Sequence, residues 1–339
     1  MKHRVCIVTC DVFLLQFLSL SIYLSNTDLL TGTCYRLFTE DAFETQLRKV
    51  AVPEIQRCNL CTVILQLKAA GIDDVTSFDF IDPPSSGAIL RSLQQLLVLG
   101  ALRESDGKLT PLGKEMSGLP LNVSFAKLLI ESFRFRCVDM ALTLVAMLSV
   151  DSVLFYPKDK REAAAAAHKR FAVFDSDHET LVSVYDAYHD AKESSDWCDK
   201  HFVNARSMRL ATRIRDQLKR MIAKKLEKLR QDDDDDDDSE EDRRRRLRQC
   251  LTASCFLCSA RVQPSVSKGS RRVYKTMVTS QTVSIHPSSV LFNRAPNCVI
   301  YNELVLTARQ YMRCLTAIPV EWLAEFAPRS FEATHRRSS

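Results

Sequence analysis

The sequence predicts a multidomain α+β protein, and three changes of residue pattern along its 339 residues lead to this prediction. Apolar residues first recur at helical spacing, then fill a strongly apolar helical middle segment, and after Leu247 give way to short runs typical of strands. A composition that is 46% hydrophobic can bury two or three cores at this length. We therefore expect several small domains rather than one large one.

The bulk composition argues against some classes of function. Eight glycines are few for a protein built on glycine-rich nucleotide-binding turns. The net charge of +5 comes from acids and bases that occur in blocks, and it favours an anionic partner. Twelve cysteines scattered among helical segments do not make the spaced framework of a secreted disulfide scaffold, so we expect free thiols.

Residues 1–30 begin with three basic side chains and continue as VCIVTCDVFLLQFLSLSIYL, which copies features of a signal peptide. Asp11 and Gln16 interrupt this run, and no small-x-small cleavage site follows Tyr23. The run is just long enough to span a bilayer, so length alone does not decide. We expect a buried or misassigned N-terminus here rather than a secretion signal or a membrane anchor.

The next two segments predict a short strand and helix followed by a winged-helix module. Residues 31–50 alternate like a strand over TCYRLFT and become helical from Glu40. Residues 51–119 follow the order helix, helix, hairpin that a winged helix has. The expected elements are a helix at 53–71, a helix at 87–99 and two short strands around the Asp106-Gly107 turn.

Residues 120–230 predict a helical bundle that ends in a strongly basic helix. The longest uninterrupted helical pattern runs from Trp197 to Arg230. At 100° per residue its cations share one sector, namely Arg206, Arg209, Arg213, Arg220, Lys224 and Lys228. The neighbouring face is apolar and consists of Leu210, Ile214, Leu218, Ile222 and Leu229. Such a rod favours a polyanion beside it, and the alternative is the solvated basic face of a bundle helix.

The last third of the chain predicts a charged insertion and a small β-barrel. Residues 231–246 contain DDDDDDDSEED followed by RRRR, and we expect a disordered insertion that can fold back on the basic stripe. Residues 247–331 contain about five short strand patterns and a closing helix, and 332–339 form a tail. The turn Ser284–Ser289 offers hydroxyls and an imidazole to a phosphate or ribose; the alternative is an ordinary strand-end loop.

Two stretches resemble nucleotide-binding motifs but fail on spacing or context. Between Gly107 and Gly113 there are five residues where a phosphate loop has four, and Glu115 stands where a Mg²⁺-binding hydroxyl is needed. Asp175-Ser-Asp-His178 follows no buried apolar strand. The Cys58/Cys61 and Cys255/Cys258 pairs fall in different modules, so we interpret them as core thiols rather than zinc ligands.

Several ordered pieces of the chain resemble the C-terminal region of DEAH-box RNA helicases, most closely those of pre-mRNA splicing. They include GTCYRLFTEDAF, VPEIQRCNL, FDFIDPP, LTPLGKEMSGLPL, DHETLVSVY, WCDKHFVNARSMRLATRIRDQL and SIHPSSVLFNRAPNCVIYNELVLTARQYM. The resemblance covers about 31–331. It implies the end of the second RecA-like domain at 31–50, a degenerate winged helix at 51–119, a ratchet-like bundle at 120–230 and an OB fold at 247–331.

The sequence departs from the family where ATP chemistry is concerned. SNTDLLT precedes Gly32 in place of the family's arginine-finger motif, and no P-loop, DEAH box or RecA-like body is found. The resemblance implies ATP and Mg²⁺ for the full-length family, whereas for this chain we expect no cofactor, no metal and no catalytic residue. We expect no ATP hydrolysis by the chain alone, which is interpreted as a truncated product or part of a longer gene.

The resemblance assigns RNA contact to two sets of residues, Arg206, Arg209, Arg213 and Arg215 in the helical region and His286, Ser288, Ser289 and Asn293 in the barrel. Our first hypothesis is a nuclear accessory region of a splicing-type helicase that grips single-stranded RNA. It implies a glycine-patch protein and spliceosome components as partners, and neither a membrane nor a small-molecule substrate. The second hypothesis is a protein-interaction scaffold that binds a glycine-patch activator while the acidic run excludes RNA.

Overall fold

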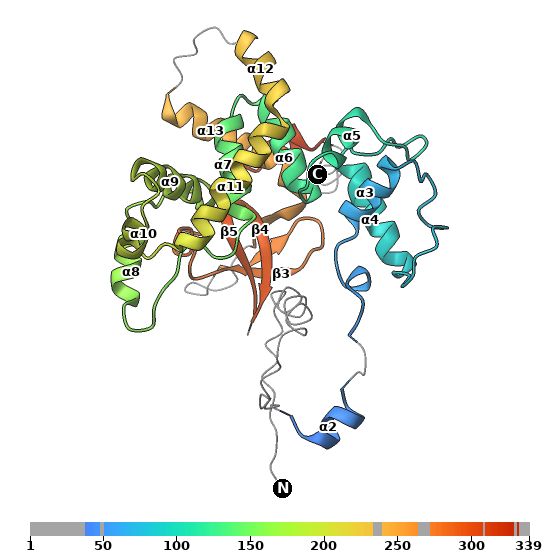
Figure 1. Cartoon of the computed structure of the whole chain (residues 1–339), viewed down its shortest axis with the longest axis horizontal. Helices are drawn as coiled ribbons and strands as arrows, with labels where there is room; N and C mark the ends of the chain where they lie inside the picture. The colour runs from blue at the N-terminus through green and yellow to red at the C-terminus, as the bar shows by residue number, and fades with distance from the viewer. Residues whose placement is uncertain are drawn as a thin grey trace, which may run out of the picture. The chain divides into compact units, whose positions relative to one another are not determined.

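The computed structural model describes residues 38–47, 51–232, 239–263, 272–307, 309–328 and 331, without the side chains of 228–232. The chain divides into two compact units, Met1–Cys58 with Ile81–Pro83, and Asn59–Phe80 with Pro84–Ser339. Figure 1 labels the helices and strands. Among the helices described, none combines the length and the apolar character that crossing a bilayer requires.

The first unit contains α2 (Glu40–Thr45) and the short 3-10 helix η2 (Glu54–Gln56). The Thr39 hydroxyl caps α2 by accepting a hydrogen bond from the Ala42 backbone N–H at 3.2 Å. The helix predicted from Glu40 therefore exists, but it ends before residue 50. The apolar run at 1–30 and most of the strand predicted before Thr39 lie outside the described residues.

The second unit begins with the helix-helix-hairpin order predicted for a winged helix. Its helices are α3 (Cys61–Ala69), α4 (Ser86–Val98) and α5 (Pro111–Ser117). The first helix starts at Cys61 rather than at Pro53, because the Asn59 side chain accepts a bond from the Cys61 N–H at 2.9 Å. The predicted hairpin is reduced to a single β-bridge between Leu102 and Leu109.

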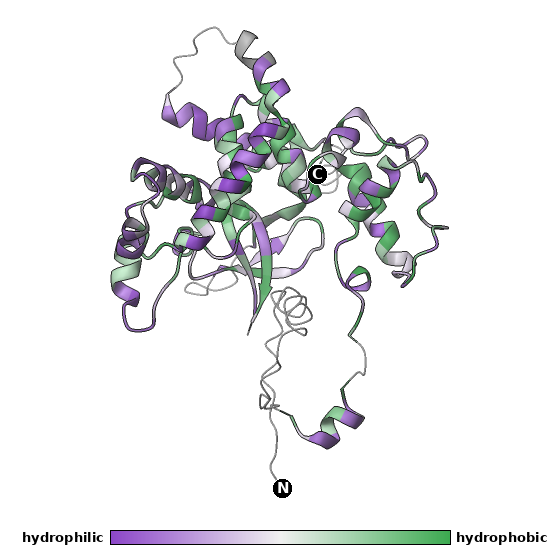
Figure 2. Cartoon of the chain, viewed as in Figure 1, coloured by the Kyte–Doolittle hydropathy of each residue, from purple (hydrophilic) through white to green (hydrophobic). Residues whose placement is uncertain are grey.

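The segment predicted as a helical bundle, 120–230, forms seven helices. They are α6 (Val123–Arg134), α7 (Val138–Leu148), α8 (Arg161–His168), α9 (Asp177–Asp190), α10 (Ser195–His201), α11 (Ala205–Met221) and α12 (Ala223–Asp232). α7 packs against α6, α9 and α11, and eight of its eleven residues are buried. Its largely hydrophobic sequence, visible in Figure 2, suits this central position.

The predicted continuous helix from Trp197 to Arg230 is wrong, because the structure interrupts it twice. Phe202 ends α10 in the left-handed conformation with φ of 55°, and Asn204 then caps α11. A second break falls at Ile222, between α11 and α12. The buried side of α11 also differs from the prediction, since Met208 and Ala211 are buried while Leu210 is 40% exposed.

The prediction of a disordered insertion at 231–246 is wrong for its second half, which forms the start of α13 (Glu240–Cys255). The Ser239 hydroxyl accepts a bond from the Asp242 N–H at 3.1 Å and donates to the Asp242 carboxylate at 2.6 Å. Glu240, one turn before Arg244, forms an ion pair with it. Figure 2 shows this first part of α13 as hydrophilic. Residues 233–238 lie outside the described part of the chain.

The predicted small barrel is confirmed as a closed five-stranded barrel in the order β1-β2-β3-β5-β4. Its strands are β1 (Ser259–Val262), β2 (Tyr274–Thr276), β3 (Thr282–Ile285), β4 (Cys298–Leu306) and β5 (Gln310–Ala317), followed by α14 (Glu321–Phe326). β3 and β5 pair in parallel, and the other neighbours pair antiparallel. Tyr274, Val299, Met312 and Leu315 are among the side chains that fill the barrel.

Candidate nucleic-acid interface

α11 begins at a side-chain cap that bonds two N–H groups of its first turn. The Asn204 side-chain oxygen accepts hydrogen bonds from the N–H groups of Arg206 at 3.0 Å and Ser207 at 3.2 Å. On the inner face, Ser207, Met208, Ala211 and Leu218 are buried. The cap and the buried face together fix which residues of α11 point outward.

Three of the arginines predicted to bind RNA lie on the outer face of α11. Arg206, Arg209 and Arg213 are exposed. They are one turn apart, so their guanidinium groups follow one side of the helix. Within the described part of the chain, no carboxylate lies within ion-pair distance of any of the three. We call these three residues the α11 cation row.

Arg215, the fourth predicted arginine, lies apart from the α11 cation row. Its side chain is 14% exposed and forms an ion pair with Asp139 on α7. Its Nε donates a hydrogen bond to the Thr143 hydroxyl at 2.9 Å, and its guanidinium lies 5.7 Å from the centre of the Tyr185 ring. The structure therefore does not bring Arg215 together with the other three arginines, because its guanidinium is occupied by α7 and α9.

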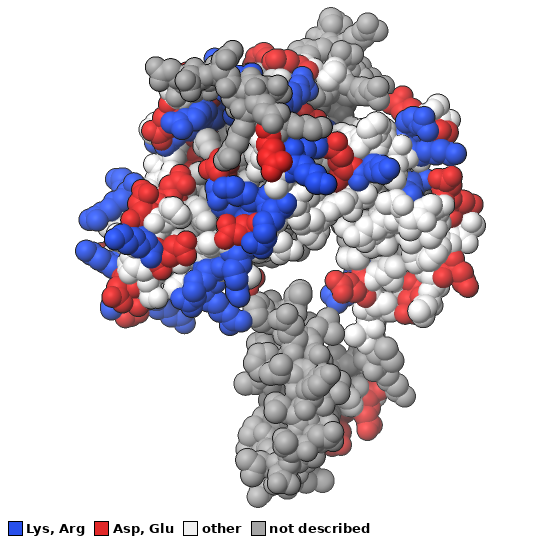
Figure 3. Space-filling model, turned by 45° about the horizontal axis from the view of Figure 1, so that its top comes forward, with Lys and Arg blue, Asp and Glu red and all other residues white. Residues whose placement is uncertain are grey.

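The positive charge of the α11 cation row continues toward the end of α11 and into the start of α12. Lys219, Arg220 and Lys224 are also exposed. Arg220 and Lys224 belong to the basic stripe predicted from the sequence, and their exposure agrees with that prediction. Lys225 is different, since it forms an ion pair with Glu115. Figure 3 shows Lys and Arg side chains gathered on the face of the molecule where Figure 1 places α11. The arrangement can contact several phosphates of an extended strand.

The second predicted set follows β3 in the barrel, where His286 and Ser288 lie together. The Ser288 N–H and hydroxyl are 3.2 Å and 2.7 Å from His286 Nδ1. Because the N–H can only donate, Nδ1 is an acceptor and the ring hydrogen of a neutral His286 is on Nε2. Partial burial and the Arg313 guanidinium lower the pKa of His286, which favours this neutral ring. Nε2–H can thus donate to a phosphate or ribose oxygen.

A pocket of about 350 Å³ opens on the barrel next to this histidine. Its wall includes Ser284, Asn293, Tyr311 and other residues of β2, β3, β5 and the neighbouring loops, among them Arg272, Tyr274, Phe292 and Arg309. The Tyr311 ring meets the His286 ring edge to face at 5.6 Å between centroids. Two arginines, an amide, a hydroxyl and an aromatic ring can together bind one nucleotide.

Only part of this pocket was predicted from the sequence. Asn293 is exposed at the pocket wall, as a binding residue must be. Arg309 and Tyr311 were missed, although they stand in the ARQYM segment used for the family resemblance. The available signal was an arginine two residues before a tyrosine in a segment predicted as a barrel strand, since a cation near an aromatic ring is typical of single-stranded nucleic-acid binding.

Ser289, the remaining predicted contact, is not available at the surface. It is 9% exposed, and its hydroxyl donates a hydrogen bond to Asp177 Oδ2 at 2.6 Å. The same Oγ also accepts a bond from the Leu291 N–H at 3.1 Å. The structure therefore places Ser289 inside the joint between bundle and barrel, and not beside His286 as an RNA contact.

The stretches that were rejected as nucleotide motifs have structural roles. Gly107 forms a turn with φ of 64°, and Gly113 lies so close to the Ala101 carbonyl oxygen that a side chain there would collide with it. Asp175–His178 starts α9. Of the four cysteines interpreted as core thiols, Cys61 and Cys255 are buried and Cys258 is partly buried, whereas Cys58 is exposed and the interpretation is wrong for it. In the described ranges, no group of three or more His, Cys, Asp or Glu side chains is placed to hold a metal ion.

Comparison with known proteins matches these domains one by one. The family described as helicase associated domain (HA2), winged-helix, matches residues 92–121, and its ratchet-like counterpart matches residues 122–181. The oligonucleotide/oligosaccharide-binding (OB)-fold family matches residues 247–330. The fold and the cationic surface thus define a class of protein, the accessory region of a nucleic-acid helicase.

Individual curated relatives narrow the class from nucleic-acid helicases to RNA helicases. The human ATP-dependent RNA helicase DHX33 is 41% identical over 303 residues, which cover 89% of this chain and 41% of that protein. The Arabidopsis thaliana pre-mRNA-splicing factor ATP-dependent RNA helicase DEAH10 is 39% identical over 316 residues, with 89% and 42% covered. The human probable ATP-dependent RNA helicase DHX35 is 38% identical over 308 residues, with 90% and 42% covered.

The chain has the helicase-associated and OB-fold domains of the C-terminal region of DEAH-box RNA helicases and is similar to such helicases over 89% of its length. It spans about two fifths of the length of the curated relatives above. The family resemblance and the winged-helix, ratchet-like and OB-fold assignments made from the sequence are confirmed.

Proposed function

We propose that this chain is the part of a DEAH-box RNA helicase that grips single-stranded RNA. The observation that carries the proposal is the α11 cation row, Arg206, Arg209 and Arg213, which is exposed and without ion pairs among the described residues. Ionised side chains that lack a protein partner can bind phosphates without first breaking an existing contact. The names of the relatives, all of them RNA helicases, support RNA as the polyanion.

The barrel supplies contacts of a second kind in this proposal. His286, Ser288 and Asn293 offer hydrogen-bonding groups beside the pocket, and Tyr311 offers a ring on which a base can stack. Phosphate contacts weaken as salt is raised, whereas stacking depends little on salt. Arg215 and Ser289 are left out, because their polar groups are used inside the protein.

We also propose a cellular role, which is more specific than the domain assignments. The splicing factor name of the Arabidopsis relative supports a role in pre-mRNA splicing, and with it a nuclear location and spliceosome components as partners. A glycine-patch protein is a further proposed partner. ATP and Mg²⁺ would act in the motor domains of a full-length helicase, and RNA contact by this chain requires no cofactor.

A binding titration of the whole chain with a labelled single-stranded RNA tests the proposal. Replacing Arg206, Arg209 and Arg213 by Ala removes three phosphate contacts, so affinity at low salt should fall by about tenfold or more. The matched control replaces three exposed cations elsewhere, Arg91, Lys169 and Arg170, and changes net charge equally. Equal losses in both triple variants would reject α11 as the RNA-binding surface.

A further inference from the structure

The first residue of α9 holds the barrel loop that follows β3. Asp177 Oδ2 accepts hydrogen bonds from the Ser289 hydroxyl at 2.6 Å and from the Leu315 N–H at 2.9 Å. Asp177 Oδ1 accepts a bond from the Val290 N–H at 2.9 Å. Leu315 belongs to β5, whereas Ser289 and Val290 belong to the loop after β3. One carboxylate from the bundle thus ties two separate segments of the barrel.

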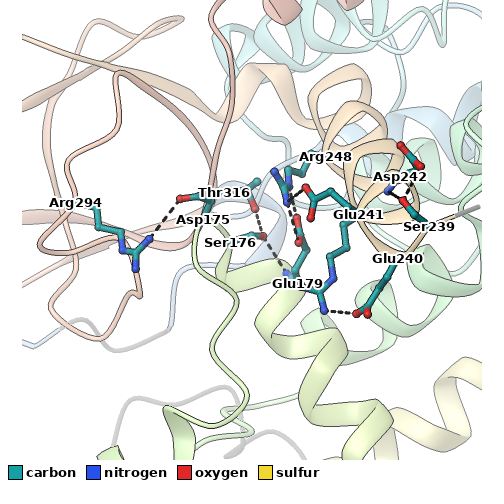
Figure 4. Close-up of polar contacts among 11 residues, drawn as sticks. Asp175, Ser176, Glu179, Ser239, Glu240, Glu241, Asp242, Arg248, Arg294 and Thr316 are labelled. Atoms are coloured by element: carbon teal, nitrogen blue, oxygen red, sulfur yellow. Dashed lines mark hydrogen bonds and ion pairs between the residues drawn. The ribbon is translucent and has the colours of Figure 1, made fainter.

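A neighbouring group of bonds joins α9 to the barrel without reaching that loop. The Thr316 hydroxyl lies 2.7 Å from both Ser176 Oγ and His178 Nδ1, and the Ala317 N–H donates to the Asp175 carbonyl at 2.9 Å. Thr316 and Ala317 belong to β5. Figure 4 shows Ser176 and Thr316 facing each other at this joint. The joint therefore has a loop-holding part, Asp177, and a strand-holding part centred on Thr316.

The same α9 helix is packed into the core that supports α11. Val184, Tyr185 and Tyr188 of α9 share one buried cluster with Met208 and Ala211 of α11. α7 packs against both helices. α11, which carries the cation row, and α9, which holds the barrel loop, therefore belong to one packed group of helices. Asp177 is the residue through which this group binds the loop.

We propose that Asp177 is a positioning residue for RNA binding, which holds the loop bearing His286 and Ser288 in place relative to α11. The inference rests on the proposed function. Asp177 acts through the loop and not by contact, because a carboxylate would repel a phosphate and this one already accepts three hydrogen bonds from the protein. Ser289 transmits the constraint, and this explains why it is buried three residues beyond the imidazole of His286.

Asp177→Asn is the direct test, because it keeps the size of the side chain and removes one acceptor oxygen. The amide nitrogen would face an N–H or O–H donor of the barrel, so part of the grip on the loop is lost. RNA affinity should fall about five- to tenfold, since the loop contacts of His286 and Ser288 are no longer held in register. Thr316→Val is the matched control, since it breaks the strand-holding part of the joint and leaves the loop-holding bonds intact. It should lower the melting temperature and keep RNA affinity.

A double-mutant cycle separates positioning from a general loss of structure. In a chain that already carries His286→Ala and Ser288→Ala, Asp177→Asn should cause no further loss of affinity, because the loop contacts it serves are gone. If Asp177→Asn does not fold, Ser289→Ala replaces it in the same cycle, since it removes the Ser289 bond to Asp177, together with the Leu291 N–H bond to Ser289 Oγ, and leaves the two backbone N–H bonds to Asp177.

The outcomes distinguish this inference from the function on which it rests. If the unchanged chain does not bind RNA, the proposed function fails and takes the inference with it. If the unchanged chain binds RNA and Asp177→Asn binds it equally well, the inference alone is overturned. Full additivity in the cycle, or an equal loss in Thr316→Val, would also overturn it, because each points to a purely structural joint.

Discussion

The outer face of α11 and the first turn of α9 are both rich in charged and polar side chains, but only α9 has protein partners for them. Arg206, Arg209 and Arg213 face solvent, and no ion pair joins them to the described residues. At α9, Glu179 is 1% exposed and accepts a bond from Arg248 Nε at 2.6 Å. Figure 4 shows Arg248 reaching Glu179 from α13.

This difference separates charged groups that are bound to a protein partner from charged groups that are available to a ligand. A buried carboxylate without a partner is costly, so Glu179 and Arg248 must stay together and serve stability. An exposed arginine without a partner contributes little to stability, because water already solvates it. Changes at the Glu179–Arg248 pair should therefore appear first in unfolding experiments, and changes on the α11 cation row first in binding experiments.

The largest effect is expected from Arg248→Met, which leaves Glu179 buried without its cation. The free energy of unfolding should fall by about 3 to 5 kcal/mol, as for other broken buried pairs. Urea denaturation measures it. Glu241→Gln is the control, since Glu241 is 74% exposed and its bond to Arg248 is longer, at 3.3 Å. A loss no larger than in the control would mean that Glu179 does not depend on Arg248 for its burial.

A pH titration of stability should show the next largest effect, at His178. Burial lowers the pKa of His178 from 6.5 to about 4, so below pH 6.5 the unfolded chain binds a proton that the folded chain does not. Stability is therefore lost as pH falls through this window, by about 2 kcal/mol between pH 7 and pH 5.

The comparison variant for this titration is His178→Gln. Burial raises the pKa of Asp177 and Glu179, and these shifts act in the opposite direction, so the difference between variant and parent is the useful quantity. The stability of the variant should depend less steeply on pH from 7 to 5. Parallel curves for the two proteins would show that His178 is not the titrating group.

Two arginines of α11 allow the comparison to be made within one helix. Arg215→Ala should lower the free energy of unfolding by about 1 to 2 kcal/mol, because the Thr143 hydroxyl and Asp139 lose a charged partner. It should change RNA affinity by less than about twofold. Arg209→Ala removes the same charge and should show the reverse pattern. If both variants behave alike, the distinction between the two faces is wrong.

The smallest effect is expected from Tyr311→Ala in the barrel pocket. Loss of one stacked base should weaken RNA binding by about 1 kcal/mol, and by the same amount at low and at high salt. Tyr311→Phe keeps the ring and should bind RNA as the parent does. A loss that disappears at high salt would instead assign the effect to neighbouring charges such as Arg309.

Much of the fold could be predicted because its signals are local. The order of helices and strands followed from apolar spacing, and the break before α11 follows from a local signal that was passed over. Asn204 is a common helix cap, and Met208, Ala211, Arg215, Leu218 and Ile222 recur at intervals of three and four. This spacing would have placed Arg215 on the buried face.

The rest of the site depends on contacts between distant parts of the chain. Asp177 and the N–H of Leu315 are 138 positions apart, and periodicity cannot pair such residues. The pocket is likewise assembled from Arg272, Ser284, Asn293 and Tyr311, which come from separate strands and loops. The family resemblance located the correct barrel segment, but only the three-dimensional packing separates the exposed Ser288 from the buried Ser289.

The most direct test of the α11 cation row is the salt dependence of RNA binding. The logarithm of the affinity falls by about 0.7 per neutralised phosphate for each log unit of salt. Replacing Arg206, Arg209 and Arg213 by Ala should therefore make the slope shallower by about 2, while the Arg91, Lys169 and Arg170 control keeps the parental slope. A triple variant that retained the full slope would contradict the account, because RNA would then be held by other cations.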